Sequence, residues 1–224
     1  MSSEKKIDVF FVDIGKVLVN FNNFKLYEKF AGVSGVSVGE VERIDREIFR
    51  PLCPEMETSK MLPYQVYQRF KTELVKNIPP DRRDNFLKSF TFSFFKEASM
   101  AMLSLKPRVL DLLKFLHKTN CKIILTSNTS SYLYDVQRLL FPQIFSNIDG
   151  CIVSHEIGYR KPERAFWLLA LEEVRGVLLE RIFVIDDLEE NVNSAKLLGM
   201  NGAVFTNVES LKSELEKFGF NFKK

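Results

Sequence analysis

The chain of 224 residues has 46% hydrophobic and 27% charged residues and a formal net charge of +3, which suits one large domain or a core with an insertion. So small a charge argues against a nucleic-acid partner, and three cysteines without CxxC spacing indicate neither a disulfide framework nor a zinc site. Residues 1–6 lead into a strand pattern rather than a signal-peptide core, and no apolar run can span a bilayer, so we expect a soluble cytoplasmic protein without a membrane partner.

The first predicted element is a buried strand that ends at Asp13. The run from Ile7 to Val12 is apolar at almost every position rather than alternating, which is typical of a parallel strand buried on both faces. Asp13 follows it directly, and Gly15 comes two residues later. Open α/β sheets bind their ligands at the carboxyl ends of their strands, so Asp13 is either a catalytic carboxylate or a strand-end cap.

The next segment, residues 19–106, is predicted to be helical, with almost no strand signal. Ser37 and Glu40 have capping-box spacing and open a helix with Ile44 and Ile48 on one side, and Asp81 is expected to cap a later helix. Large apolar residues recur at helical intervals: Tyr64, Tyr67, Phe70 and Leu74 in one helix, and Phe86, Leu87, Phe90 and Phe94 in the helix after Asp81. We expect these aromatic residues to form the core of a small inserted helical domain.

From Pro107 onward, strands alternate with helices. Pro107 is expected to begin a helix, and Gly199 to close the helix that starts at Asn191. Buried strands are predicted at residues 121–125, 150–153, 181–185 and 203–205. This alternation predicts an α/β fold with a doubly wound parallel sheet. Residues 1–18 and 107–224 would form the core domain, and residues 19–106 the inserted domain.

Polar residues follow four of the predicted strands, and in a doubly wound sheet these strand ends share one edge. The residues are Asp13, Ser127, Asn128, Lys161, Asp186 and Asp187. Taken singly, each has a structural explanation as a turn, a helix cap or a solvated lysine. Converging carboxylates repel one another, and a hard divalent cation, typically Mg²⁺, would relieve that repulsion. Lys161 and the Ser127 hydroxyl suit a phosphoryl group, which Asp13 would attack to form an aspartyl-phosphate.

The order of these groups resembles the haloacid dehalogenase-like (HAD) hydrolase superfamily, mostly phosphatases, over the whole chain. Residues 13–17 resemble its first motif, 125–128 its second, 160–163 its third, and 184–187 with Asn191 its fourth. The resemblance implies a Rossmann-like core with an inserted helical cap. Within the insertion, Glu57 to Met61 resembles a cap loop that many members write Glu-Thr-Gly-Lys-Ile. The nearest subgroup is that of small sugar-phosphate phosphatases with an Asp-Leu-Gly-type first motif.

Two positions depart from the family pattern. Typical family phosphatases have a second aspartate two residues after the nucleophile as general acid and base, whereas this chain has Gly15, which has no proton to give. The Gly15 carbonyl would still supply a metal ligand, so the resemblance implies a metal set of Asp13, Gly15, Asp186 and Asp187, with Asp187 in direct contact. Lys16 replaces a small residue, and we expect it to point into solvent rather than to bind phosphate.

We therefore expect a Mg²⁺-dependent phosphatase of a small phosphorylated metabolite such as a sugar phosphate, acting as a monomer or homodimer. The expected catalytic residues are Asp13, Ser127 and Lys161, and the expected substrate-binding residues are Ser127, Asn128, Lys161 and Glu57. Two alternatives stay open. A non-catalytic descendant that binds a phosphorylated ligand or a protein would explain Gly15 and Lys16. A 2-haloacid dehalogenase also lacks the second aspartate, but that branch needs no metal and usually replaces fourth-motif acids.

Overall fold

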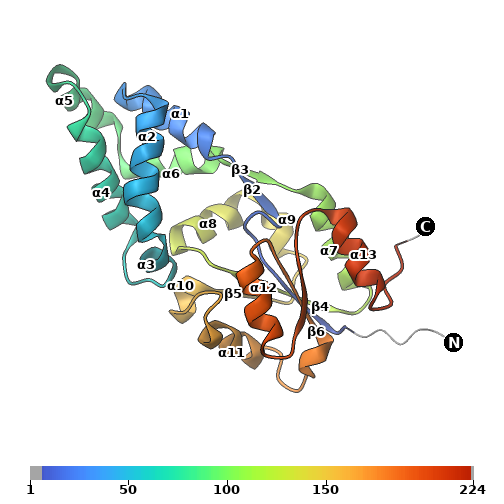
Figure 1. The fold of residues 1–224 in the computed structure, drawn as a ribbon. Helices are drawn as coiled ribbons and strands as arrows, with labels where there is room; N and C mark the ends of the chain where they lie inside the picture. Colours follow the sequence, from blue (N-terminus) through green and yellow to red (C-terminus); the bar gives the residue numbers. More distant parts are fainter. Residues whose placement is uncertain (1–6, 223–224) are drawn as a thin grey trace.

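The computed structural model describes residues 7–222, so the expectation for residues 1–6 lies outside the described part of the chain. Its centre is a parallel sheet with helices on both faces (Figure 1). The sheet has five strands in the order β5-β4-β1-β6-β7. The strands are β1 (Val9–Val12), β4 (Lys122–Ser127), β5 (Gly150–Val153), β6 (Ile182–Asp186) and β7 (Asn201–Val204). All five predicted strands are present, which confirms the doubly wound α/β fold.

Strand β1 is the middle of the sheet, and its side chains alternate between two helical layers. Phe10 pairs in register with Ile123 of β4 and with Phe183 of β6. On the Phe10 face lie α7 (Pro107–Lys118), α8 (Ser131–Leu140), α9 (Pro142–Phe145) and α13 (Val208–Glu216). On the Phe11 face lie α10 (Ser154–Ile157), α11 (Arg164–Glu172) and α12 (Glu189–Lys196). Burial on both faces explains why the strand sequences are continuously apolar.

A helical insertion leaves the core after β1 and returns before α7 (Figure 1). Its helices are α1 (Asn23–Ser34), α2 (Val38–Ile44), α3 (Cys53–Glu57), α4 (Pro63–Lys76), α5 (Pro80–Ser89) and α6 (Phe92–Ala101). Phe30 is 2% exposed, and its ring centroid lies 5.3, 5.1 and 5.5 Å from those of Phe70, Phe90 and Phe95. The expected core is confirmed for Tyr67, Phe70, Leu74, Phe86 and Phe90, which are buried. It is wrong for Tyr64 and Leu87, which are 51% and 45% exposed.

The two crossings between core and insertion form a short antiparallel pair, β2 (Val19–Phe21) with β3 (Leu103–Leu105), which the sequence did not predict. Phe21 pairs with Leu103, and a further hydrogen bond from Asn22 N to Met102 O, 2.7 Å long, continues the ladder. Each strand has only three residues, too few for an alternating pattern to stand out from the neighbouring helices.

The helix expected after Asp81 differs from the structure. Helix α5 begins at Pro80 with Pro79 as its N-cap, so Asp81 lies in the first turn and does not cap it. Phe90 follows the end of α5, and Phe94 belongs to the separate helix α6, because Thr91 accepts a hydrogen bond from Phe94 N and starts a new helix there.

Two predicted helix signals are confirmed, and one helix changes type. Ser37 caps α2 by accepting a hydrogen bond from Glu40 N, and Gly199 has the left-handed φ of 102° expected beyond a helix end. Helix α2 ends at Ile44, where a π-helical turn (Asp45–Phe49) and a 3₁₀ turn (Arg50–Leu52) follow. No helix within residues 7–222 is both long enough and apolar enough to cross a membrane.

Candidate active site

The predicted polar residues meet at the carboxyl edge of the sheet, as the topology requires. Asp13 directly follows β1, Ser127 ends β4, Asp186 ends β6, and Lys161 lies in the turn between α10 and α11. They line a cavity of about 300 Å³, here called the strand-end pocket. Its other lining residues are Gly15, Lys16, Phe21, Asn23, Glu57, Asn128, Arg160, Asp187, Leu188 and Asn191. Every site residue predicted from the sequence lines this pocket.

Lys161 is the buried centre of the pocket, with 1% of its surface exposed. Its Nζ donates three hydrogen bonds: to Asp13 Oδ1 at 2.7 Å, to Asp186 Oδ2 at 2.6 Å and to the Thr126 carbonyl at 2.7 Å. Burial alone lowers the pKa of a lysine, but the charges and hydrogen bonds of Asp13 and Asp186 outweigh it and raise the pKa of Lys161. The side chain is therefore a fixed cation between two carboxylates.

Asp13 keeps one carboxylate oxygen available. Oδ1 accepts the hydrogen bond from Lys161, whereas Oδ2 accepts none from residues 7–222. Burial raises the pKa of Asp13 to about 7; the Lys161 charge opposes this rise, and the charges of Asp186 and Asp187 add to it. Lys161 thus orients the carboxylate by one oxygen and leaves the other facing the pocket, an arrangement suited to a nucleophile or a metal ligand.

The two fourth-motif acids have different surroundings. Asp186 is 1% exposed, and both of its oxygens are engaged: Oδ2 with Lys161, and Oδ1 with Leu188 N and Asn191 Nδ2, each at 2.9 Å. The side chain of Asp187 is 18% exposed, and its Oδ2 lies 3.4 Å from Lys16 Nζ. Asp186 thus holds the pocket together, while Asp187 presents its carboxylate at the pocket mouth.

Lys16 has a φ of 54°, in the left-handed region, and its side chain is 67% exposed. It points largely into solvent, as expected, but its ammonium also pairs with Asp187. Glycine adopts such a φ without the strain that a Cβ causes, which fits the glycine that the family pattern favours here. An exposed ion pair of this kind is weak and breaks easily.

The chemistry of the donor set fits Mg²⁺, although residues 7–222 contain no group of three His, Cys, Asp or Glu side chains placed to hold a metal. Mg²⁺ keeps several water ligands and commonly binds one or two carboxylates. Within residues 7–222, Asp13 Oδ2 accepts no hydrogen bond, and Asp187 has only its ion pair with the exposed Lys16. The Gly15 carbonyl accepts a hydrogen bond from Val17 N at 2.6 Å and has a second lone pair.

Ser127 and Asn128 end β4 but differ in their contacts. Asn128 Nδ2 donates to the Lys161 carbonyl, and Asn128 Oδ1 accepts from Lys161 N, both at 2.8 Å. The asparagine amide therefore fixes the backbone that carries the buried lysine. Ser127 is 3% exposed, and its hydroxyl has no hydrogen-bond partner among residues 7–222. Of the two, Ser127 is the one free to donate to a ligand in the pocket.

Glu57, the residue expected from the insertion, reaches the strand-end pocket through α3. Its Oε2 accepts a hydrogen bond from Arg160 Nε at 2.8 Å, and burial raises its pKa, with the Arg160 charge opposing. Ser59, which stands where the similar cap loop has glycine, has a φ of 56°, and its hydroxyl donates to the His155 carbonyl at 2.6 Å. These two contacts join the insertion to the core beside Lys161.

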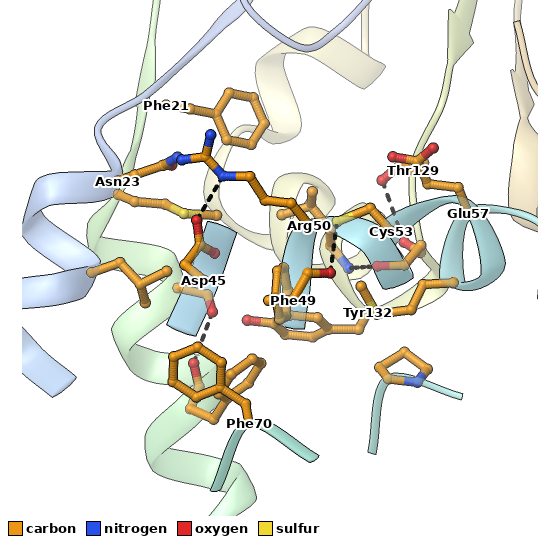
Figure 2. Close-up of a pocket in the computed structure, with 18 of the residues that line it drawn as sticks. Phe21, Asn23, Asp45, Phe49, Arg50, Cys53, Glu57, Phe70, Thr129 and Tyr132 are labelled. Atoms are coloured by element: carbon orange, nitrogen blue, oxygen red, sulfur yellow. Dashed lines mark hydrogen bonds and ion pairs between the residues drawn. The ribbon is translucent and has the colours of Figure 1, made fainter. Parts of the chain in front are cut away.

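A second cavity of about 270 Å³, the aromatic cavity, adjoins the strand-end pocket (Figure 2). Phe21, Asn23, Glu57 and Asn128 line both. The aromatic cavity lies between the insertion and the start of α8, and its aromatic lining consists of Phe21, Tyr27, Phe30, Phe49, Phe70, Phe95 and Tyr132.

The sequence interpretation missed a polar network in the aromatic cavity. Asp45 Oδ2 accepts hydrogen bonds from Tyr27 Oη at 2.7 Å and from Arg50 Nε at 2.8 Å. The pair Asp45 and Arg50 is five residues apart, and the π-helical turn, which hydrogen-bonds residues i and i+5, brings them to the same side. An acid on the apolar side of a predicted helix was the available signal, because a buried carboxylate needs a partner.

Comparison with known proteins agrees with this geometry. The model of the haloacid dehalogenase-like hydrolases matches residues 7–199. The chain belongs to this hydrolase family. A search of the curated proteins gave no significant match.

Solved structures of HAD proteins share the fold of this HAD-like hydrolase. The HAD family enzyme bt-2542 from Bacteroides thetaiotaomicron has a TM-score of 0.73 at 20% identity, covering 93% of this chain and 99% of its own. A HAD-like family hydrolase from Porphyromonas gingivalis has a TM-score of 0.70 at 19% identity, with 94% and 98% covered. A dehalogenase crystallised with an intermediate has a TM-score of 0.57 at 16% identity, with 88% and 84% covered. The bt-2542 enzyme also has a structure with magnesium and inorganic phosphate (TM-score 0.68, 20% identity, 92% and 98% covered).

The HAD-like chain has room at the position of its unusual glycine. A Cβ built on Gly15 would lie 3.5 Å from Phe21 Cε2 and 3.6 Å from Asp13 Oδ2, both ordinary van der Waals distances, and the φ of Gly15 is not in the left-handed region. Neither steric crowding nor backbone conformation therefore requires glycine here. The fold would therefore also accept a residue with a side chain at position 15, and the missing carboxylic acid is a chemical difference rather than a steric requirement.

Proposed function

We propose that this HAD-like hydrolase is a Mg²⁺-dependent phosphatase of a small phosphorylated metabolite, acting through an aspartyl-phosphate on Asp13. The observation that carries the proposal is the asymmetric environment of the Asp13 carboxylate. Lys161 fixes Oδ1, while Oδ2 faces a pocket that also contains the Ser127 hydroxyl. A nucleophile held by one oxygen and open at the other is poised to attack.

In the first step, Asp13 Oδ2 would form a bond to phosphorus while the bond from phosphorus to the leaving oxygen breaks, and that oxygen keeps the electron pair. In the second, water attacks phosphorus, and the bond from phosphorus to Asp13 breaks with its electron pair returning to the carboxylate. Inorganic phosphate then leaves with the protons of that water. All three N–H groups of Lys161 are engaged, so its contribution would be its positive charge beside the transferring group. Ser127 would donate a hydrogen bond to a phosphoryl oxygen.

Asp187, the Gly15 carbonyl and the remaining lone pair of Asp13 Oδ1 are the groups that would hold Mg²⁺, so that Asp13 Oδ2 stays the nucleophile. The ion would supply charge neutralisation at the phosphoryl oxygens. The magnesium and phosphate complex of bt-2542 supports the choice of metal and ligand. Asp186 was expected as a metal ligand and Asn128 as a substrate-binding residue. Both would instead act as positioning residues, because their polar atoms already bind Lys161 and its neighbours. Glu57 would border the substrate rather than bind the phosphoryl group, because Arg160 occupies its carboxylate.

The dehalogenase among the fold neighbours means that the fold alone does not choose the reaction. The acids favour phosphoryl transfer: Asp187 offers a carboxylate at the pocket mouth, which a metal-independent displacement at carbon has no use for. The same open carboxylates argue against a role limited to ligand binding.

The test is hydrolysis of a panel of phosphorylated compounds with Mg²⁺ and with EDTA, using the native protein, Asp13→Asn and the matched control Asp8→Asn. Asp8 lies at the opposite end of β1, where it pairs with Arg181. We expect Mg²⁺-dependent phosphate release that falls by about 10³-fold or more in Asp13→Asn only. Release of chloride from 2-chloropropionate, or hydrolysis that survives in Asp13→Asn, would contradict the proposal.

A further inference from the structure

The aromatic cavity is placed to receive the part of a substrate that leaves with the ester oxygen. It shares four lining residues with the strand-end pocket, so a phosphoryl group at Asp13 points the rest of the molecule toward it. A dry cavity of about 150 Å³ holds benzene. At about 270 Å³, the aromatic cavity has room for one or two fused rings. What it accepts depends on which polar atoms face the occupant.

Most polar side chains around the aromatic cavity already have partners. The Ser99 hydroxyl donates to the Phe95 carbonyl, and the Ser130 hydroxyl accepts from Leu133 N. Glu57 and Asn128 are bound to Arg160 and to the Lys161 backbone. A sugar leaving group would bury several hydroxyls among aromatic rings, and each hydroxyl left without a partner would weaken binding by roughly tenfold. A flat apolar group would lose nothing.

Arg50 is the charged group that still offers donors. Its Nε binds Asp45 and its Nη2 donates to Tyr27 Oη at 3.1 Å, which leaves further N–H groups on a side chain that is 53% exposed. Arg50 lines the aromatic cavity together with Phe21 and Asn23 (Figure 2), and both of these residues also line the strand-end pocket. Asp45 offsets the charge of Arg50, so this donor suits a neutral acceptor such as a carbonyl better than a second anion.

We infer that the substrate of this enzyme is an aryl phosphate monoester whose ring carries a neutral hydrogen-bond acceptor for Arg50. The inference rests on the proposed function and adds the class of leaving group. Gly15 supports it independently: a phenolate is weakly basic and leaves without a proton from the enzyme. In the reaction, the Asp13 Oδ2–phosphorus bond forms, the phosphorus–aryl oxygen bond breaks, and the phenolate takes the electron pair.

The first experiment measures kcat and KM of the native protein with Mg²⁺ for 1-naphthyl phosphate, acetyl phosphate and glucose 6-phosphate. Acetyl phosphate has an even better leaving group but no ring, so it separates leaving-group chemistry from the cavity. We expect a KM for 1-naphthyl phosphate about tenfold or more below that for acetyl phosphate, from burial of the ring. Equal KM values for 1-naphthyl phosphate and acetyl phosphate, with both substrates hydrolysed, would overturn the inference about the leaving group. The proposed phosphatase function would be unaffected by that result. Failure of all three with Mg²⁺ would overturn the proposed function as well.

The second experiment compares 4-acetylphenyl phosphate, whose carbonyl is a neutral acceptor, with phenyl phosphate, which has none. The ratio of their kcat/KM values is measured in each protein. The two substrates differ in leaving group by the same amount in every variant, so a change in this ratio reports on the acceptor. Arg50→Met should lower that ratio by about tenfold, the value of one hydrogen bond. The matched control is Arg46→Met, which alters an exposed arginine of the π-helical turn that directly precedes Arg50. Asp45→Asn combined with Arg50→Met removes both charges should the single variant fail to fold. A ratio unchanged in a folded Arg50 variant would refute the role of Arg50.

Discussion

Restoring a carboxylic acid at position 15 should change which leaving groups the enzyme tolerates. In Gly15→Asp the new Cβ meets Phe21 Cε2 at 3.5 Å and Asp13 Oδ2 at 3.6 Å, so the side chain enters without displacing the backbone. The neighbouring Phe21 ring disfavours a charged carboxylate, which helps to keep the new acid protonated and able to donate. The variant should therefore gain a general acid within the strand-end pocket.

The size of the gain depends on how much the leaving oxygen needs a proton. General acid catalysis contributes about 10²–10⁴-fold when an alkoxide must leave, and little when a phenolate leaves. For an alkyl phosphate such as glycerol 3-phosphate we expect kcat/KM of Gly15→Asp to rise by about 10²-fold, the lower end of that range, because the acid has no evolved surroundings. For phenyl phosphate we expect a change within about threefold.

The assay is phosphate release from both substrates under conditions where chemistry limits the rate. Gly15→Asn is the matched control, since the amide has nearly the shape of the acid but has no acidic proton. An equal rise in Gly15→Asn would mean that shape, not acidity, causes the effect. An unchanged ratio of alkyl to aryl rates in a folded Gly15→Asp would refute the reasoning that Gly15 limits the native enzyme.

Three further predictions concern the charges of the strand-end pocket and their support. Lys16→Met should raise the affinity for Mg²⁺ by up to about fivefold, measured by calorimetry, because it frees Asp187 from an exposed ion pair worth at most about 1 kcal/mol. Asp187→Asn should lower that affinity. Weaker Mg²⁺ binding in Lys16→Met would contradict the assignment of Asp187 as a metal ligand. Without metal, the pKa of Asp13 raised to about 7 means that the folded state holds this proton more tightly than the unfolded chain, so the stability it contributes is present below pH 4 and is lost as the pH rises to 7. In EDTA the free energy of unfolding of the native protein should therefore fall by up to about 4 kcal/mol between pH 4 and pH 8, relative to that of Asp13→Asn. The same pH dependence of the free energy of unfolding in both proteins, measured with urea, would refute this. Asn128→Ala should lower the free energy of unfolding by about 1–3 kcal/mol, because it unpairs the Lys161 backbone. The control is Asn147→Ala, a half-buried asparagine that donates only to neighbouring residues, and equal losses in both would contradict a supporting role for Asn128.

The sheet and its polar edge could be predicted from the sequence because their signals are local. Continuous apolar runs identify strands buried on both faces, and a polar residue directly after such a run must lie at the carboxyl edge. Asp13 and Asp186 were found in this way. The role of Asn128 in holding the Lys161 backbone could not be predicted in this way. Its hydrogen-bond partner is 33 positions away, and no local pattern encodes a contact over that separation.

The aromatic cavity escaped prediction for a different reason. Its polar network depends on α2 turning π-helical at Asp45, which places Arg50 beside that carboxylate, and on α1 bringing Tyr27 to both. A regular α-helix, the default interpretation of this segment, would turn Asp45 and Arg50 away from each other. The β2–β3 pair could not be predicted either, because strands of three residues are too short to show a periodic pattern.

The β2–β3 pair has a consequence for how this enzyme could change over evolutionary time. Phe21 and Leu103 are directly paired, so the whole insertion departs from and returns to neighbouring positions of one small ribbon. A two-residue turn such as Asn-Gly could replace residues 22–102 and leave an ordinary hairpin on an intact sheet. The insertion is thus an exchangeable module. Another helical segment joined to β2 and β3 would change the residues that line the aromatic cavity, while Asp13, Lys161 and Asp186 would keep their positions.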